Sequence, residues 1–162
     1  MRTKVLSAAL GVVIAVTPFA PLSAACGSRD ESAAFHVRAL QTELMVAALS
    51  CRGVGYDQRY AQFVQKFGPS LGTHGKALQT YFKKRYGGQG TTQLDRYVTS
   101  IANAASHRSM VDGGFCQGAA GLFDSVLRLE RKDLASFSAT LPFTDGPATQ
   151  LACAGSSVTA KR

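Results

Sequence analysis

Apolar residues at helical spacing are the feature that most constrains the fold of this chain of 162 residues. From residue 28 onward they recur every three or four positions, as in the stripe formed by Val37, Leu40, Leu44 and Ala47. No segment shows the sustained alternation of apolar and polar residues that is typical of a half-buried strand. The pattern therefore predicts an all-α protein.

Glycine-containing breaks divide this pattern into predicted helices. The first helix begins at a capping box, Ser28-Arg29-Asp30-Glu31, and ends before Gly53. A short second helix over residues 57–67 stops at Gly68-Pro69, because proline disfavours helical backbone in the residue before it. The remaining helices are expected over residues 70–86, from a cap at Thr91 or Thr92 to residue 105, and over residues 112–129, with an extension of the last to Phe137 left open.

These elements predict a disulfide-stapled helical bundle of four longer helices and one short helix. We expect a single domain over residues 26–162, with the ordered bundle over residues 28–141 and an irregular tail over residues 142–162. Four glycines fall inside the predicted helices despite their low helix propensity: Gly72, Gly75, Gly118 and Gly121. We interpret them as sites of close helix packing, and the alternative is a backbone that approaches a ligand.

The first 25 residues have the organisation of a secretory signal peptide. A positively charged start, MRTK, precedes an apolar run over residues 5–16, and the small residues Ser23 and Ala25 precede Cys26. The apolar run is shorter than the roughly 20 residues that a membrane-spanning helix needs. We therefore expect cleavage after Ala25, export to the periplasm or the extracellular space, and no transmembrane helix in the mature chain.

Acylation of Cys26 would instead anchor the mature chain as a lipoprotein. An acylation site is expected to carry a branched apolar residue three positions before the cysteine, and Ser23 occupies that position. Acylation would also leave three other cysteines, one of them without a partner. We therefore favour cleavage and a disulfide at Cys26, with the lipoprotein as the alternative.

Four cysteines remain after cleavage, and an even number in an exported chain predicts two disulfides. A straight first helix would hold Cys26 and Cys51 roughly 35 Å apart, which is too far for a disulfide. Two pairings remain: Cys51–Cys116 with Cys26–Cys153, or Cys26–Cys116 with Cys51–Cys153. We favour the first, because a short second helix that crosses one end of the bundle would bring the start of the last helix beside Cys51.

No residue pattern in the chain predicts catalysis, a metal or a cofactor. His36, His74 and His107 are too far apart in sequence to form a paired-histidine metal motif, and we expect His74 in the core and the other two on helix surfaces. No two cysteines have C-x-x-C spacing, and no G-x-S-x-G motif occurs. The sequence therefore predicts a protein that is not an enzyme.

The net charge of +8 falls to +6 when Arg2 and Lys4 leave with the signal peptide. A basic exported protein is attracted to anionic partners, and because the charge is scattered we do not expect nucleic acid among them. The candidate contact combines cations with an aromatic ring at the end of a predicted helix and comprises Lys83, Lys84, Arg85 and Tyr86. The alternative is that these cations only stabilise the helix terminus.

The sequence thus predicts an exported protein of the cell envelope that binds a partner and has no recognisable catalytic site. The partner is an envelope protein or an anionic envelope surface. Two alternatives stay open: a small secreted hydrolase whose active site has no sequence motif, and a protein that binds anionic lipid surfaces.

Overall fold

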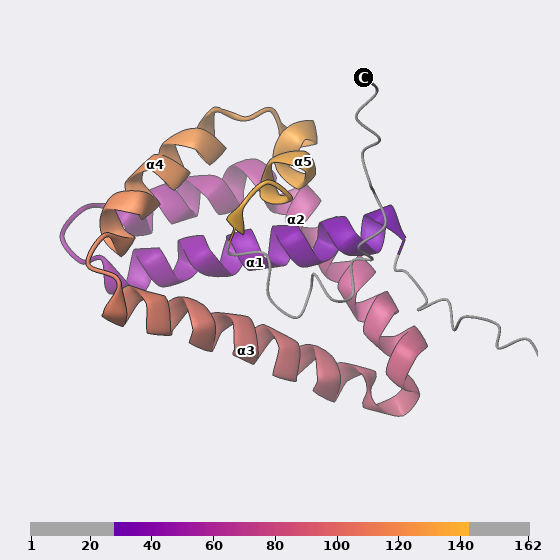
Figure 1. The fold of residues 1–162 in the computed structure, drawn as a ribbon. Helices are drawn as coiled ribbons and strands as arrows, with labels where there is room; N and C mark the ends of the chain where they lie inside the picture. Colours follow the sequence, from indigo (N-terminus) through magenta and orange to yellow (C-terminus); the bar gives the residue numbers. More distant parts are fainter. Residues whose placement is uncertain (1–27, 143–162) are drawn as a thin grey trace, which may run out of the picture.

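A computed structural model describes residues 28–142 and shows the predicted all-α fold. Figure 1 shows α1 running through the middle of the molecule, with α3 below it and α4 and α5 above it in this view. The elements in chain order are α1 (Arg29–Ser50), α2 (Tyr56–Tyr86), the 3₁₀ turn η1 (Gly87–Gln89), α3 (Gly90–Val111), α4 (Phe115–Arg128), the 3₁₀ turn η2 (Arg131–Asp133) and α5 (Leu134–Ser138). The bundle has four longer helices and one short helix, but the short helix is α5 and not the segment over residues 57–67.

The central helix, α1, begins at the predicted capping box. The Ser28 hydroxyl accepts a hydrogen bond from the Glu31 N–H (3.2 Å), and the Glu31 carboxylate accepts one from the Ser28 N–H (2.8 Å). α1 packs against α2, α3, α4 and α5, so that residues outside the predicted apolar stripe are also buried. For this reason the prediction that His36 lies on a helix surface was wrong, since His36 is only 8% exposed.

The predicted break at Gly68-Pro69 is absent, and α2 continues through it as one helix of 31 residues. Proline has no N–H and its ring crowds the carbonyl four residues earlier, which bends a helix without always ending it. Figure 1 shows α2 changing direction part-way along its length. Buried aromatic side chains on both sides of the bend, Phe67 before it and Phe82 after it, hold both halves against the rest of the bundle.

The two halves of α2 pack into different hydrophobic cores. The main core combines α1, the first half of α2, α4, α5 and Ala105 of α3, and its fully buried members include Leu44, Phe63 and Phe123. The second core lies between α1, the second half of α2 and α3. There the Phe35 ring contacts the rings of Tyr81 and Tyr97 edge-on, with centroids 5.1 Å apart in each pair. One continuous helix therefore serves both cores.

Tyr97 gives the second core a testable pH dependence. Burial raises the pKa of Tyr97 above its ordinary value, and its hydroxyl donates to the Phe35 carbonyl at 3.3 Å. Above about pH 10 the unfolded chain loses the phenol proton while the folded chain keeps it, so the free energy of unfolding must fall as the pH rises. We expect wild type to lose stability more steeply than Tyr97→Phe between about pH 10 and 11. Urea unfolding of both proteins across this range measures the difference, and parallel slopes would contradict it.

The turn between α2 and α3 also differs from the prediction. α3 begins at Gly90, before the predicted caps Thr91 and Thr92, because η1 joins the two helices and the Gly87 carbonyl accepts from the Gly90 N–H. A Cβ atom on Gly90 would lie 2.8 Å from the Lys83 Cα and 2.9 Å from the Phe82 carbonyl oxygen. The two helices can therefore meet this closely only at a residue without a side chain.

We expect Gly90→Ala to lower the free energy of unfolding by about 1–3 kcal/mol, because the backbone atoms it would strike cannot move away cheaply. Gly88→Ala is the matched control, since a Cβ at Gly88 would meet nothing within 4 Å. Urea unfolding followed by circular dichroism compares the variants. Equal losses in both would show that the turn relaxes around the added methyl group.

A disulfide joins Cys51 to Cys116, as predicted, with Cα atoms 5.6 Å apart. Cys51 directly follows the last residue of α1, and Cys116 lies in the first turn of α4. The pairing arises because α2 leads away from this end of the bundle and α3 returns to it. The alternative pairing, Cys26–Cys116 with Cys51–Cys153, is excluded by this bond, while Cys26 and Cys153 themselves lie outside the residues that the structure describes.

Candidate functional site

α4 presents two different faces to its surroundings. One face carries Phe115, Ala119, Phe123 and Val126, which are buried in the main core. The helix was predicted to begin at Asp112 or just after it, and it begins at Phe115, while Asp112 follows the last turn of α3. The Asp112 side chain accepts from the Gly114 N–H at 2.8 Å and shapes the turn between the two helices.

The opposite face of α4, bordered by Phe115 and Ala119 of the core face, forms one wall of a groove with a volume of about 740 Å³. Its lining from α4 and from the end of the described chain is mostly apolar or small: Phe115, Gly118, Ala119, Gly121, Leu122, Ser125, Phe137, Leu141 and Pro142. Its polar lining comes from α1 and from the C-terminal end of α3: Glu43, Arg108 and Asp112. The groove thus has an apolar side and a polar side, contributed by different elements.

Gly118 and Gly121 expose the backbone of α4 to this groove. A Cβ atom at either position would meet nothing within 4 Å, and the same is true of Gly72 and Gly75 in α2. The prediction that these four glycines allow close helix packing was therefore wrong. No neighbouring helix comes close enough to these glycines for a side chain to obstruct its packing. At Gly121 and Gly118 that space belongs to the groove.

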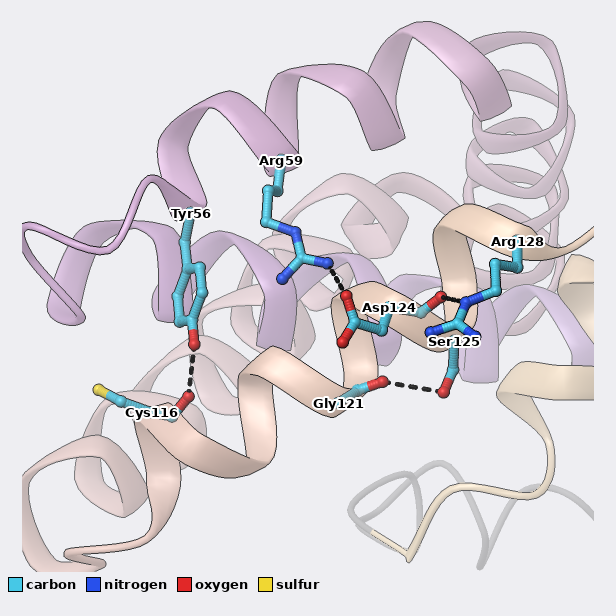
Figure 2. A network of polar contacts seen from close by, with 7 residues as sticks. All are labelled: Tyr56, Arg59, Cys116, Gly121, Asp124, Ser125 and Arg128. Atoms are coloured by element: carbon cyan, nitrogen blue, oxygen red, sulfur yellow. Dashed lines mark hydrogen bonds and ion pairs between the residues drawn. The ribbon is translucent and has the colours of Figure 1, made fainter.

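The wall formed by α4 is fixed to the bundle from behind. In Figure 2 the Tyr56 hydroxyl donates to the Cys116 carbonyl (2.8 Å), and Arg59 forms an ion pair with Asp124. The Lys66 ammonium donates to the Leu127 carbonyl at 2.6 Å, one turn further along. Figure 2 also shows the Ser125 hydroxyl donating back to the Gly121 carbonyl (2.8 Å) on the groove side. With the disulfide, these contacts hold the groove wall in place without a ligand.

A partly buried ion pair lies on the polar side of the groove. The Glu43 carboxylate in α1 pairs with the Arg108 guanidinium in α3, and the two side chains are 10% and 37% exposed. Such a buried carboxylate is costly without a cation beside it. Neither residue was predicted from the sequence to belong to a site, although Glu43 directly precedes the apolar run of residues 44–49 and so stands in a stretch expected to be buried.

The predicted contact residues Lys83, Lys84, Arg85 and Tyr86 lie together at the C-terminal end of α2. All four are exposed, and none of them lines the groove. The Arg85 guanidinium lies 5.9 Å from the centroid of the Tyr86 ring, which stacks on Phe82. Hydrogen bonding to Tyr86 raises the pKa of Arg85. Within residues 28–142, no carboxylate forms an ion pair with these three cations.

Within residues 28–142, no group of three or more His, Cys, Asp or Glu side chains is arranged to hold a metal ion. Among the helices of the same range, none is both long enough and apolar enough to span a bilayer. Of the three histidines, His74 is half-buried and burial lowers its pKa, while His107 is exposed as predicted.

Comparison with known proteins gives no further guidance. No model of a protein family matches the chain, and searches of curated proteins and of solved structures likewise found no similar protein. The groove and the exposed basic end of α2 are the two features of the described residues that indicate a function.

Proposed function

We propose that this is an exported protein of the cell envelope that binds a small apolar ligand in the groove beside α4, without catalysing a reaction. The observation that carries the proposal is the groove itself, with its mostly apolar lining from α4 and from Phe137, Leu141 and Pro142. Export is supported by the signal-peptide pattern of residues 1–25 and by the Cys51–Cys116 disulfide, which is typical of oxidising compartments.

Three properties of the groove support ligand binding. Its volume falls within the roughly 300–1,000 Å³ of small-molecule sites, which are mostly apolar with a few polar groups. Its wall is already fixed by the contacts of Tyr56, Arg59 and Lys66, so that little ordering is required on binding. Gly118 and Gly121 let a ligand touch the α4 backbone.

The two glycines provide a direct test, because alanine should improve the fold and impair binding. Alanine is favoured over glycine in a helix by about 1 kcal/mol, and the added methyl groups meet no protein atom within 4 Å. We therefore expect Gly118→Ala/Gly121→Ala to raise the free energy of unfolding while narrowing the groove. N-phenyl-1-naphthylamine, a neutral apolar fluorophore, is the probe, and its emission increases in an apolar site.

We expect saturable binding of the probe to wild type and at least tenfold weaker binding to the double variant. Gly72→Ala is the matched control: it adds a methyl group to an exposed helical glycine outside the groove, and should stabilise the fold without changing probe affinity. Unchanged affinity in the double variant would contradict the proposal. So would the lack of saturable binding by wild type.

A second candidate function is binding to an anionic surface through Lys83, Lys84, Arg85 and Tyr86. It is favoured by the exposure of these three cations and by the absence of ion pairs to them from carboxylates within residues 28–142. Their attraction to a charged surface should be screened strongly as the salt concentration rises. The same residues could instead meet an acidic partner protein, which would leave no affinity for lipid.

Co-sedimentation with vesicles of phosphatidylglycerol and phosphatidylcholine tests this second function. We expect binding at about 50 mM salt that is lost at about 300 mM salt, and that is reduced in Lys83→Gln/Lys84→Gln/Arg85→Gln. Arg128→Gln, at an exposed arginine of α4, is the control for a change in net charge. Equal binding to pure phosphatidylcholine vesicles would contradict the electrostatic account.

A further inference from the structure

The charge around the groove has the opposite sign to the charge of the chain. Among residues 28–142, three charged side chains line the groove, namely Glu43, Arg108 and Asp112, and they sum to −1. The whole chain carries +8. A ligand that enters the groove therefore meets a locally negative site on a positively charged protein.

The net negative charge of the groove lining is concentrated at Asp112, on the polar side of the groove. Arg108 is already paired with Glu43, so its charge is offset within the groove lining. Asp112 is exposed in the turn between α3 and α4, and no cation within residues 28–142 forms an ion pair with it. One of its oxygens accepts from the Gly114 N–H, which fixes where the carboxylate points. Asp112 is thus a held, solvent-facing negative charge at the polar side of the groove.

The apolar side of the groove is formed largely by small residues of α4. The groove face of α4 places Gly118, Gly121 and Ser125 along one side of the helix, and the Ser125 hydroxyl is turned back onto the Gly121 carbonyl. This leaves a strip of backbone without protruding side chains in a groove that Leu122 and Phe137 also line. A strip without protruding side chains suits a slender alkyl chain that lies along the helix.

We propose that the groove selects a single-chain amphiphile with a cationic head. The alkyl chain lies against Gly118 and Gly121, and the head lies beside Asp112 and the Glu43–Arg108 pair. An anionic head at the same place would face a net negative charge and be repelled. This inference rests on the proposed ligand-binding function and adds the chemical class of the ligand.

Three amphiphiles with the same twelve-carbon chain test it by displacement of N-phenyl-1-naphthylamine at pH 7, below their micelle concentrations. Dodecylamine is a cation at this pH, dodecyldimethylamine oxide is a zwitterion with no net charge, and dodecanoate is an anion. We expect dodecylamine to displace the probe at a concentration at least tenfold lower than dodecanoate, with the amine oxide between them. This preference should weaken as salt is raised.

The variant Asp112→Asn tests the position of the head, since asparagine can still accept from the Gly114 N–H. It should reduce the preference for dodecylamine over dodecanoate by threefold or more and leave the amine oxide unchanged. Asp95→Asn, at an exposed aspartate of α3 outside this groove, should leave all three affinities unchanged.

The outcomes separate the inference from the proposed function. If all three amphiphiles bind with equal affinity, or if dodecanoate binds best, the preference for a cationic head is wrong. The proposed binding of apolar ligands in the groove is then unaffected. The inference also fails if Asp112→Asn affects the three equally, or if none of them displaces a bound probe. If wild type does not bind the probe at all, the proposed function itself fails.

Discussion

Removal of the Cys51–Cys116 disulfide is expected to lower the free energy of unfolding by about 4 kcal/mol. The two residues are 65 positions apart, so the bond closes a long loop that contains all of α2 and α3. Closing such a loop restricts the unfolded chain, and the restriction grows with loop length. The bond also holds the first turn of α4 beside the end of α1. The double variant Cys51→Ala/Cys116→Ala should therefore unfold at much lower urea concentration.

Urea unfolding followed by circular dichroism measures this loss. Ser50→Ala, at the exposed last residue of α1, is the control for a substitution beside the disulfide. It should leave stability within about 0.5 kcal/mol of wild type. A loss below about 1 kcal/mol in the double variant would show that the packing of α4 holds this end of the bundle without the bond.

The second large effect is expected at the partly buried ion pair of the groove. Arg108→Met should cost about 3 kcal/mol, because it leaves the Glu43 carboxylate with no paired cation in a position where its side chain is 10% exposed. Glu43→Gln should cost about 1 kcal/mol, since the Arg108 side chain is 37% exposed and water can solvate part of its charge. We therefore predict that Arg108→Met lowers the free energy of unfolding more than Glu43→Gln does.

An exposed ion pair provides the comparison. Glu130 and Lys132 also form an ion pair, with side chains 72% and 76% exposed. Glu130→Gln should change the free energy of unfolding by less than about 0.5 kcal/mol. Thermal or urea unfolding of the three variants tests the order. If Glu43→Gln were as costly as Arg108→Met, the difference in burial between the two side chains would not control the energetics.

Local features of the sequence predicted the parts of the fold that depend on near neighbours. The Ser28–Glu31 capping box was predictable because both of its hydrogen bonds join residues three apart. The Cys51–Cys116 bond was predicted correctly, but from a short second helix crossing one end of the bundle, and α2 is instead one long helix. The pairing arises because α2 leads away from the end of α1 and α3 returns to it.

Features that depend on distant packing were not predictable. Pro69 remains inside α2 because Phe67 and Phe82 are buried in two separate cores, one on each side of it. His36 is buried because α1 is covered by four other helices, which its own periodicity does not reveal. Similarly, Glu43 and Arg108 meet only because α3 returns beside α1.

The groove was the least predictable feature, because its lining comes from α1, α3, α4, α5 and the chain that follows α5. One signal was present in the sequence, since Gly118 and Gly121 interrupt a helix that otherwise has good apolar spacing. Helix packing and ligand approach both explain such glycines. Only the open space beside them in the folded chain distinguishes the two explanations.

Amide chemical shifts of the ¹⁵N-labelled protein, titrated with N-phenyl-1-naphthylamine, test most directly that the groove beside α4 is the binding site. We expect the largest shift changes at Gly118, Gly121 and Ser125, with little change at Lys83 through Tyr86 at the far end of α2. Largest changes at Lys83 through Tyr86, or small changes spread over all helices, would contradict the account.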